Sequence, residues 1–129
     1  MIQLIKKYEE KLIRHGLATN ASIVIGGMDA EVVWNRDSSE ITVLSNVINQ
    51  MNINCILFAR PAEPYFSILH YLTTVEHPTV ISPEDCETRT FLHDIPIAKE
   101  FTTEEIVSHL NHRKSVLISG KGIVTYGVV

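Results

Sequence analysis

The spacing of apolar residues divides the chain into alternating helices and strands. Apolar positions recur at helical spacing along 2–15, from Ser38 or Ser39 to Met51, from Pro64 to about Leu72, and along 102–112. This spacing predicts four helices. Short β-rich or continuous apolar runs predict strands at 22–25, 31–34, 55–58, 79–81, 95–97, 115–119 and 123–129. Residues 83–93 are polar and predict either a short helix or an irregular turn.

Turn and cap residues mark the ends of several predicted elements. Gly26-Gly27 predicts the turn of a hairpin between the first two strands, and Gly120-Lys121-Gly122 predicts a tight turn between the last two. Thr102 and Glu105 have the three-residue spacing of a capping box at the start of a helix. Pro96 favours an edge position for its strand, because proline cannot donate to a neighbouring strand.

The helix that begins near Ser38 and the strand that follows it form the centre of the pattern. Ser38 or Ser39 is a favourable N-cap, and Glu40 adds negative charge to the first turn. The buried side of the helix is predicted to consist of Ile41, Leu44, Val47, Ile48 and Met51. The next strand, 55–58, is apolar at every position and is therefore expected to be buried on both faces.

Strands that alternate with helices predict an α/β fold with a central sheet, as one domain over residues 1–129. The two hairpins predict antiparallel neighbours, so the sheet is expected to be mixed and largely antiparallel, with helices on both faces. In such a domain, catalytic and ligand-binding residues usually lie in polar turns and in the loop at the end of a buried strand.

Net charge, apolar runs and cysteine usage limit the kinds of partner and environment that the sequence supports. The net charge is −4, with 11 basic and 15 acidic residues, which gives no support to binding of nucleic acid or an anionic membrane. No apolar run is long enough to span a bilayer. Cys55 and Cys86 stand far apart, with no second cysteine near either, so the sequence predicts a reducing, cytoplasmic environment and no disulfide.

Three segments, in order, resemble the class II aldolase/adducin family, which includes zinc-dependent sugar-phosphate aldolases and epimerases. Ser38-Ser39-Glu40 matches the family's Ser-Ser-Glu turn before a helix. The strand 55–61 ends in Phe-Ala-Arg-Pro where the family has His-x-His-Pro, and Gly120-Lys121-Gly122 stands in place of Asn-His-Gly. The passage 16–26 resembles the family's opening Gly-Asn-x-Ser turn, which adds Asn20 to the expected ligand-binding residues.

The resemblance also predicts that the family zinc site is lost. Three histidines hold zinc in the family, and their positions here are Phe58, Arg60 and Lys121. Phenylalanine has no ligand atom, arginine is not deprotonated in practice, and lysine must lose its proton before it can coordinate. We therefore expect no metal or other cofactor. Compared with the family, the segment between Trp34 and Ser38 is very short and lacks the usual phosphate-loop material, and the helices that normally follow the last strand are absent.

The resemblance implies a small-anion site. It assigns phosphate contacts to Ser38 and Ser39 and an acid/base role to Glu40, whose pKa a partly closed cleft would raise. Arg60 and Lys121 would face the former metal pocket, where two cations can bind a carboxylate or phosphate and pair with Glu40. The ordinary alternatives are a capped helix with a first-turn glutamate and a structural ion-pair cluster.

Three functional hypotheses follow. The first is a non-catalytic or regulatory class II aldolase-like protein. It would form a homo-oligomer that covers the apolar segment 126–129. It would bind a small anion at Ser38, Ser39, Arg60 and Lys121. The second is a metal-independent lyase or isomerase acting on a small phosphorylated or carboxylated compound, with Glu40 as acid and base. The third is residual zinc aldolase activity with ligands recruited from elsewhere in the chain. Whether the protein is an enzyme stays open between them.

Overall fold

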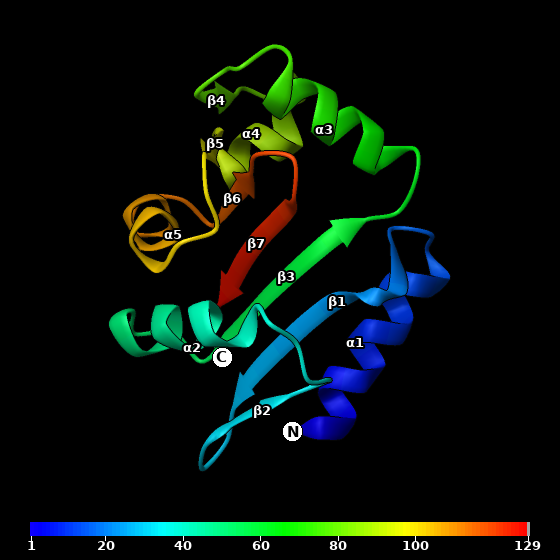
Figure 1. Ribbon diagram of the computed structural model, residues 1–129, viewed down its shortest axis with the longest axis vertical. Helices are drawn as coiled ribbons and strands as arrows, with labels where there is room; N and C mark the ends of the chain where they lie inside the picture. The colour runs from blue at the N-terminus through cyan, green and yellow to red at the C-terminus, as the bar shows by residue number, and fades with distance from the viewer. Residues whose placement is uncertain (129) are drawn as a thin grey trace.

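The sheet of this protein is mixed, and helices cover both of its faces (Figure 1). The computed structural model describes residues 1–128. Its helices are α1 (Ile2–Arg14), α2 (Ile41–Gln50), α3 (Tyr65–Thr74), α4 (Cys86–Leu92) and α5 (Thr103–Leu110). Its strands are β1 (Ala18–Met28), β2 (Val32–Trp34), β3 (Cys55–Pro61), β4 (Val80–Ile81), β5 (Ile95–Ala98), β6 (Ser115–Ile118) and β7 (Gly122–Gly127). The predicted last strand extended to Val129, which lies outside the described residues.

The seven strands of the described chain follow the order β2-β1-β3-β7-β6-β5-β4. Only the β5–β6 pair is parallel, so the predicted largely antiparallel sheet with helices on both faces is confirmed. β3 is an interior strand between β1 and β7, and the loop to α3 begins at its carboxyl end. No helix within residues 1–128 is long and apolar enough to cross a membrane.

The predicted turn at Gly26-Gly27 is wrong, because both glycines lie inside β1. Gly26 pairs with Trp34 of β2, and a Cβ at Gly26 would come within 2.5 Å of the Trp34 ring. A Cβ at Gly27 would lie 2.8 Å from the Met1 sulfur. These glycines therefore make room for side chains that pack across the strand. The chain reverses after them, between β1 and β2.

Two separate apolar clusters hold the helices against the sheet. The larger lies under α2 and α5 and includes Leu44, Ile106 and Val124, all fully buried. The predicted buried side of α2 is confirmed in its centre, where Leu44, Val47 and Ile48 are buried, and its ends are partly exposed. The smaller cluster, built around Ile5, lies under α1 on the opposite face.

Three other details differ from the sequence predictions. Of the apolar residues of β3, Ile56 and Phe58 are buried, whereas Cys55 and Leu57 are partly exposed because α1 covers only part of their face. β5 is not an edge strand, since the two-residue β4 pairs beyond it and places Val80 opposite Pro96. The helix α5 ends at Leu110 rather than His112.

The predicted capping box of α5 is present in part. The Thr102 side chain accepts a hydrogen bond from the Glu105 amide. The Glu105 carboxylate accepts hydrogen bonds from the amides of Lys99 and Glu100.

One buried carboxylate anchors the loop that leads to α2. Glu9 of α1 is only 5% exposed, although its helix position looked polar in sequence. Arg36 Nη2 donates to Glu9 Oε1 at 2.5 Å, and Lys6 Nζ donates to the Asn35 carbonyl at 2.9 Å. The Asn35 side chain in turn bonds to the backbone of β1, accepting from Ile25 and donating to Ile23. The loop that follows β2 is thereby fixed to both α1 and β1.

Candidate functional site

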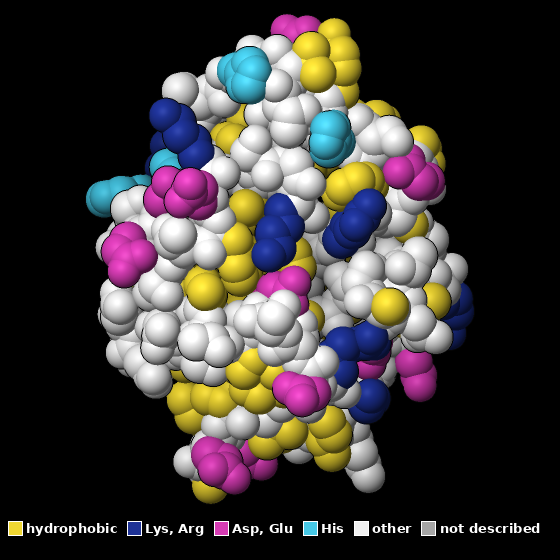
Figure 2. Space-filling view, in the orientation of Figure 1, with side chains coloured by type: hydrophobic (Ala, Val, Ile, Leu, Met, Phe, Trp, Pro, Cys, Tyr) yellow, Lys and Arg dark blue, Asp and Glu magenta, His cyan; other side chains and the backbone are white. Residues whose placement is uncertain are grey.

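A polar cavity of about 440 Å³ lies at the carboxyl end of β3, on the face of the sheet that α2 covers. It is lined by Thr19, Ala21, Ser22, Val24, Ser38, Glu40, Phe58, Arg60, Gly120 and Lys121. Figure 2 looks onto this face, where two basic side chains flank an acidic one near the middle of the surface. Segments from β1, the loop before α2, β3 and the β6–β7 turn therefore meet at one place.

Glu40 is the acidic group of this cavity, and two serines hold its carboxylate. Ser38 and Ser39 both donate their hydroxyls to Glu40 Oε2, the second at 3.3 Å. The N-cap of α2 is consequently Glu40 itself, without a side-chain cap bond, and the predicted Ser38 or Ser39 cap is wrong. The serine hydroxyls are occupied by the neighbouring carboxylate, so the first turn of α2 relies on backbone bonds.

The expected rise in the pKa of Glu40 is also wrong. Partial burial of this carboxyl raises its pKa, but hydrogen bonds from Ser38, from its own backbone amide and from Ser39, and the nearby Lys121 ammonium, outweigh that effect. The pKa of Glu40 therefore lies below its ordinary value of 4.5, and the group is ionised at neutral pH.

Lys121 stands in the turn between β6 and β7, opposite Glu40. Its Nζ lies 3.8 Å from Glu40 Oε1 and 4.2 Å from the centre of the Phe101 ring. Gly120 precedes it with a φ of +64°, a conformation that glycine adopts without strain. Thr73 of α3 accepts from the Gly120 amide through its hydroxyl and from the Ser119 hydroxyl through its carbonyl, so α3 secures the turn.

Arg60 is the second cation and comes from the end of β3. Its Cζ lies 3.9 Å above the centre of the Phe66 ring, which belongs to α3. Stacking on an aromatic face restrains a guanidinium plane and leaves its N–H edge available. Within residues 1–128, Arg60 forms no salt bridge, so the expected pairing with Glu40 is made by Lys121 alone.

The residues at the family zinc positions do not fit a metal. Phe58 lines the cavity with its ring, 5.7 Å from the Lys121 ammonium and 5.1 Å from the Phe101 ring. Arg60 is stacked on Phe66 and Lys121 is paired with a carboxylate, so neither side chain offers an uncharged nitrogen that could coordinate a metal. Nor do any three His, Cys, Asp or Glu side chains of the described part of the chain form a group that could hold a metal.

The structure brings together four of the six expected site residues: Ser38, Glu40, Arg60 and Lys121 line the cavity. Ser39 reaches it only through its bond to Glu40, and Asn20 is exposed and is not among the lining residues.

The sequence analysis missed several residues that shape the site. Thr19 and Ser22 line the cavity from an irregular part of β1, where the pairing with β3 shifts between Ala18 and Ile23. Their side chains and backbone bond to one another, with Ser22 Oγ donating to the Thr19 carbonyl at 2.8 Å. Phe66 and Phe101 supply the rings under the two cations. The Ser/Thr-rich run 19–22 was a signal for the bulge, but no sequence signal connected the two rings to the cations.

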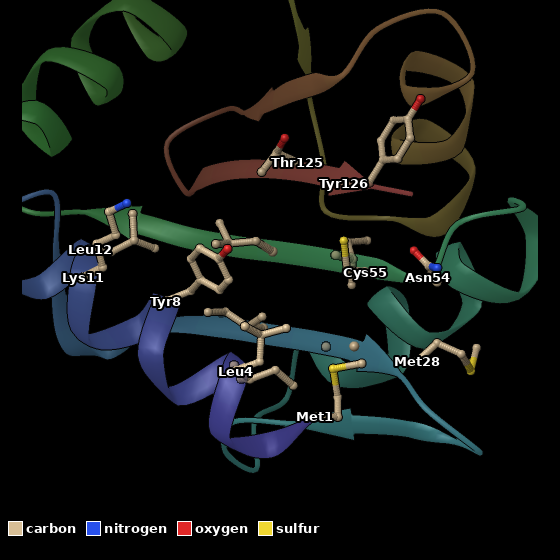
Figure 3. A pocket seen from close by; sticks show the side chains of 17 residues that line it. Met1, Leu4, Tyr8, Lys11, Leu12, Met28, Asn54, Cys55, Thr125 and Tyr126 are labelled. Atoms are coloured by element: carbon tan, nitrogen blue, oxygen red, sulfur yellow. The ribbon is translucent and has the colours of Figure 1, made fainter. Parts of the chain in front are cut away.

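A second cavity, of about 410 Å³, lies on the other face of the sheet and has a different character (Figure 3). It runs between α1 and strands β1, β3 and β7, and its lining is mainly apolar, with Leu4 and Tyr8 extending from α1 toward the sheet. It contains no acidic side chain among its described lining residues, and Lys11 is its one charged member. Its chemistry fits packing rather than binding of a polar ligand.

Comparison with known proteins bears on the fold. No protein-family model and no curated protein matches the chain. Among solved structures, L-fuculose-1-phosphate aldolase from Thermus thermophilus is similar, with a TM-score of 0.78 and 16% identity over 99% of this chain and 79% of that chain. A second L-fuculose 1-phosphate aldolase structure has a TM-score of 0.75 and 16% identity over 99% and 75% of the two chains.

The Escherichia coli protein YgbL, assigned provisionally as an aldolase/epimerase/decarboxylase, is similar too, with a TM-score of 0.75 and 9% identity over 98% of this chain and 77% of that one. Identities this low establish a shared fold and leave activity open. The resemblance first drawn from the Ser-Ser-Glu turn and the end of β3 is thereby confirmed at the level of fold, and the chain is class II aldolase-like.

Proposed function

We propose that the protein binds a small anionic ligand, a phosphate or a carboxylate, in the cavity at the end of β3, without zinc and in a non-catalytic or regulatory role. The observation that carries this proposal is Arg60, which faces the cavity with no salt-bridge partner within residues 1–128. Lys121 adds a second positive charge, which Glu40 balances at 3.8 Å. One uncompensated cation in a partly closed cavity favours an anion.

Anion binding is expected to raise the unfolding temperature of the protein, because a ligand that binds only the folded state stabilises it. At about 100 times its dissociation constant, such a ligand adds about 2.7 kcal/mol. The measurement is thermal unfolding of protein purified without a chelator, in the presence of inorganic phosphate, a sugar phosphate and short carboxylates. We expect the stabilisation without added metal, and Arg60→Ala and Lys121→Ala should each remove most of it.

The matched controls for this experiment are Arg14→Ala and Lys114→Ala. Arg14 lies in α1, and Lys114 lies over the Tyr126 ring, so both are cations outside the cavity. Both controls should keep the full stabilisation. An unchanged shift in Arg60→Ala and Lys121→Ala would refute the proposed site, and one tightly bound zinc per chain would refute its metal-free chemistry.

Catalysis by Glu40, as a metal-independent lyase or isomerase, is the second candidate. The carboxylate faces the same cavity and is ionised, so it can accept a proton, which supports this candidate. Its lowered pKa makes it a weak base and a poor acid near neutral pH, which favours binding over catalysis. Turnover of a bound compound that Glu40→Gln abolishes without weakening binding would support the catalytic alternative instead.

Self-association is a further part of the proposal, carried over from the family resemblance. The apolar cavity beside α1 supports it, since Leu4 and Tyr8 are 47% and 51% exposed at its rim. Exposed apolar clusters of this kind often mark interfaces. Sedimentation velocity is expected to give a mass above that of one 14.5 kDa chain. A single species of monomer mass at micromolar concentration would exclude a stable oligomer.

A further inference from the structure

The donors and charges of the cavity discriminate between the two classes of anion named above. The resemblance assigned phosphate contacts to the hydroxyls of Ser38 and Ser39, yet both hydroxyls donate to the Glu40 carboxylate. At the start of α2 the N-cap residue is Glu40, which makes no side-chain cap bond, so a charged carboxylate lies beside the first turn. A phosphate placed there would be repelled by that carboxylate. The groups that remain for an anion are the side chains of Arg60 and Lys121.

The charge of the cavity suits a monoanion. Its charged lining residues are Arg60, Lys121 and Glu40, so one positive charge stays uncompensated. A carboxylate balances that charge. A phosphate monoester, which carries between one and two negative charges at neutral pH, exceeds it and is repelled by Glu40.

The shape of the available donor suits a carboxylate. The guanidinium of Arg60 is held 3.9 Å above the Phe66 ring, which restrains its plane. A restrained guanidinium offers two parallel N–H donors, and these match the two oxygens of a carboxylate. Because the ring is already in place, little side-chain freedom remains to be lost when such a ligand binds.

The ion pair of Lys121 and Glu40, which lines the same cavity as Arg60, suits a hydroxyl group of the ligand. Lys121 Nζ and Glu40 Oε1 are 3.8 Å apart, with the ammonium also held 4.2 Å from the Phe101 ring centre. A ligand hydroxyl can accept a hydrogen bond from the ammonium and donate one to the carboxylate. A ligand ammonium group would suit Glu40 but would be repelled by Lys121, so a neutral hydroxyl fits the pair better.

We propose that the ligand of this cavity is a small hydroxy monocarboxylate, with its carboxylate on Arg60 and its hydroxyl between Lys121 and Glu40. This inference rests on the proposed anion-binding function and names the ligand class. The volume of about 440 Å³ leaves room for a short organic acid.

Isothermal titration calorimetry at pH 7 and constant ionic strength, with lactate, propionate and inorganic phosphate, tests the ligand class. Propionate is the matched control, since it lacks only the hydroxyl of lactate. Lactate should bind about ten-fold more tightly than propionate, the effect of one hydrogen bond to a charged group, and more tightly than phosphate. Phosphate affinity equal to or above that of lactate, or equal affinities for lactate and propionate, would overturn the inference and leave the anion-binding function intact. If none of the three binds, the proposed function fails as well.

Two conservative variants assign the contacts. Arg60→Lys keeps the charge but loses the two-pronged donor, so lactate affinity should fall about ten-fold while the phosphate response changes little. Glu40→Gln removes the negative charge and should raise the affinity for phosphate relative to lactate. If Arg60→Lys weakens phosphate and lactate equally, the planar contact is refuted. Thermal unfolding without ligand establishes that each variant is folded, and the comparison of the three anions on the unaltered protein decides the question independently of both variants.

Discussion

Replacing Glu9 with alanine is expected to lower the free energy of unfolding by about 3 kcal/mol, the lower end of the cost of breaking a buried ion pair. Glu9 is 5% exposed and accepts from Arg36 at 2.5 Å, while the Arg36 side chain is 29% exposed. The Arg36 Nε is buried and already lacks a hydrogen-bond partner. Without Glu9, much of the guanidinium would remain buried and uncompensated, and that is the main source of the loss.

Urea unfolding at pH 7 measures this effect, with Glu10→Ala as the matched control. Glu10 is the next residue of α1 and is exposed, so its removal should change the stability by less than about 0.5 kcal/mol. The double variant Glu9→Ala/Arg36→Ala should lose less than the sum of the two single losses, because neither charge is then left alone. Equal, small effects of Glu9→Ala and Glu10→Ala would contradict a structural role for the buried pair.

Replacing Gly122 with alanine is expected to cost about 3 kcal/mol of stability, the upper part of the usual range for overpacking. A Cβ at Gly122 would lie 2.3 Å from the Ala59 carbonyl oxygen and 3.0 Å from the Phe58 ring. The first of these contacts is with backbone, so β7 must move away from β3 to relieve it. Lys121 is adjacent, so the same movement should weaken binding of any anion in the cavity.

Gly127→Ala is the control for this substitution, because Gly127 ends the same strand. A Cβ there would meet only the Cys55 sulfur, at 2.8 Å, and that side chain can rotate away at a cost of about 1 kcal/mol. Thermal unfolding and anion titration of both variants give the comparison. Retention of wild-type stability by Gly122→Ala would mean that the two strands tolerate a wider separation than the structure has.

Glu9→Ala and Gly122→Ala both act on contacts that lie outside the candidate site and hold its segments in position. The Glu9–Arg36 pair fixes the loop that carries Ser38 and Glu40, and Gly122 permits the close approach of strands that places Lys121 beside Glu40. The site residues come from segments far apart in sequence, and contacts outside the cavity hold those segments together. A loss of anion binding in either variant would therefore reflect geometry rather than a missing ligand contact.

Elements governed by local periodicity were predicted well from the sequence. The buried residues of α2 repeat at helical spacing, and the apolar run 55–58 falls in β3, an interior strand, although Cys55 and Leu57 are only partly buried. The Thr102 cap of α5 depends on residues three positions apart, so it too was visible in the sequence. The match of Ser38-Ser39-Glu40, the end of β3 and Lys121 to family motifs also predicted correctly that three distant segments meet.

Features that depend on distant contacts were predicted poorly. Gly26-Gly27 has the composition of a turn, but the Trp34 ring needs the space above Gly26, so the strand continues. Glu9 has the sequence context of a solvated residue, but in the fold it accepts a hydrogen bond from Arg36, which is 27 positions away. The direction of the Glu40 pKa was also mistaken, because burial could be anticipated but the bonds from Ser38 and Ser39 to the carboxylate could not.

The sequence by itself determined the order of helices and strands, the absence of histidine from the family metal positions, and the identity of the charges that replace it. Only the tertiary structure decided that Arg60 stacks on Phe66 while Lys121 pairs with Glu40, which leaves one cation for a ligand. The physical reason is the range of the interactions concerned. Helical and strand periodicity arises between neighbours in the chain, whereas pairing, stacking and pKa depend on which groups folding brings within a few ångströms.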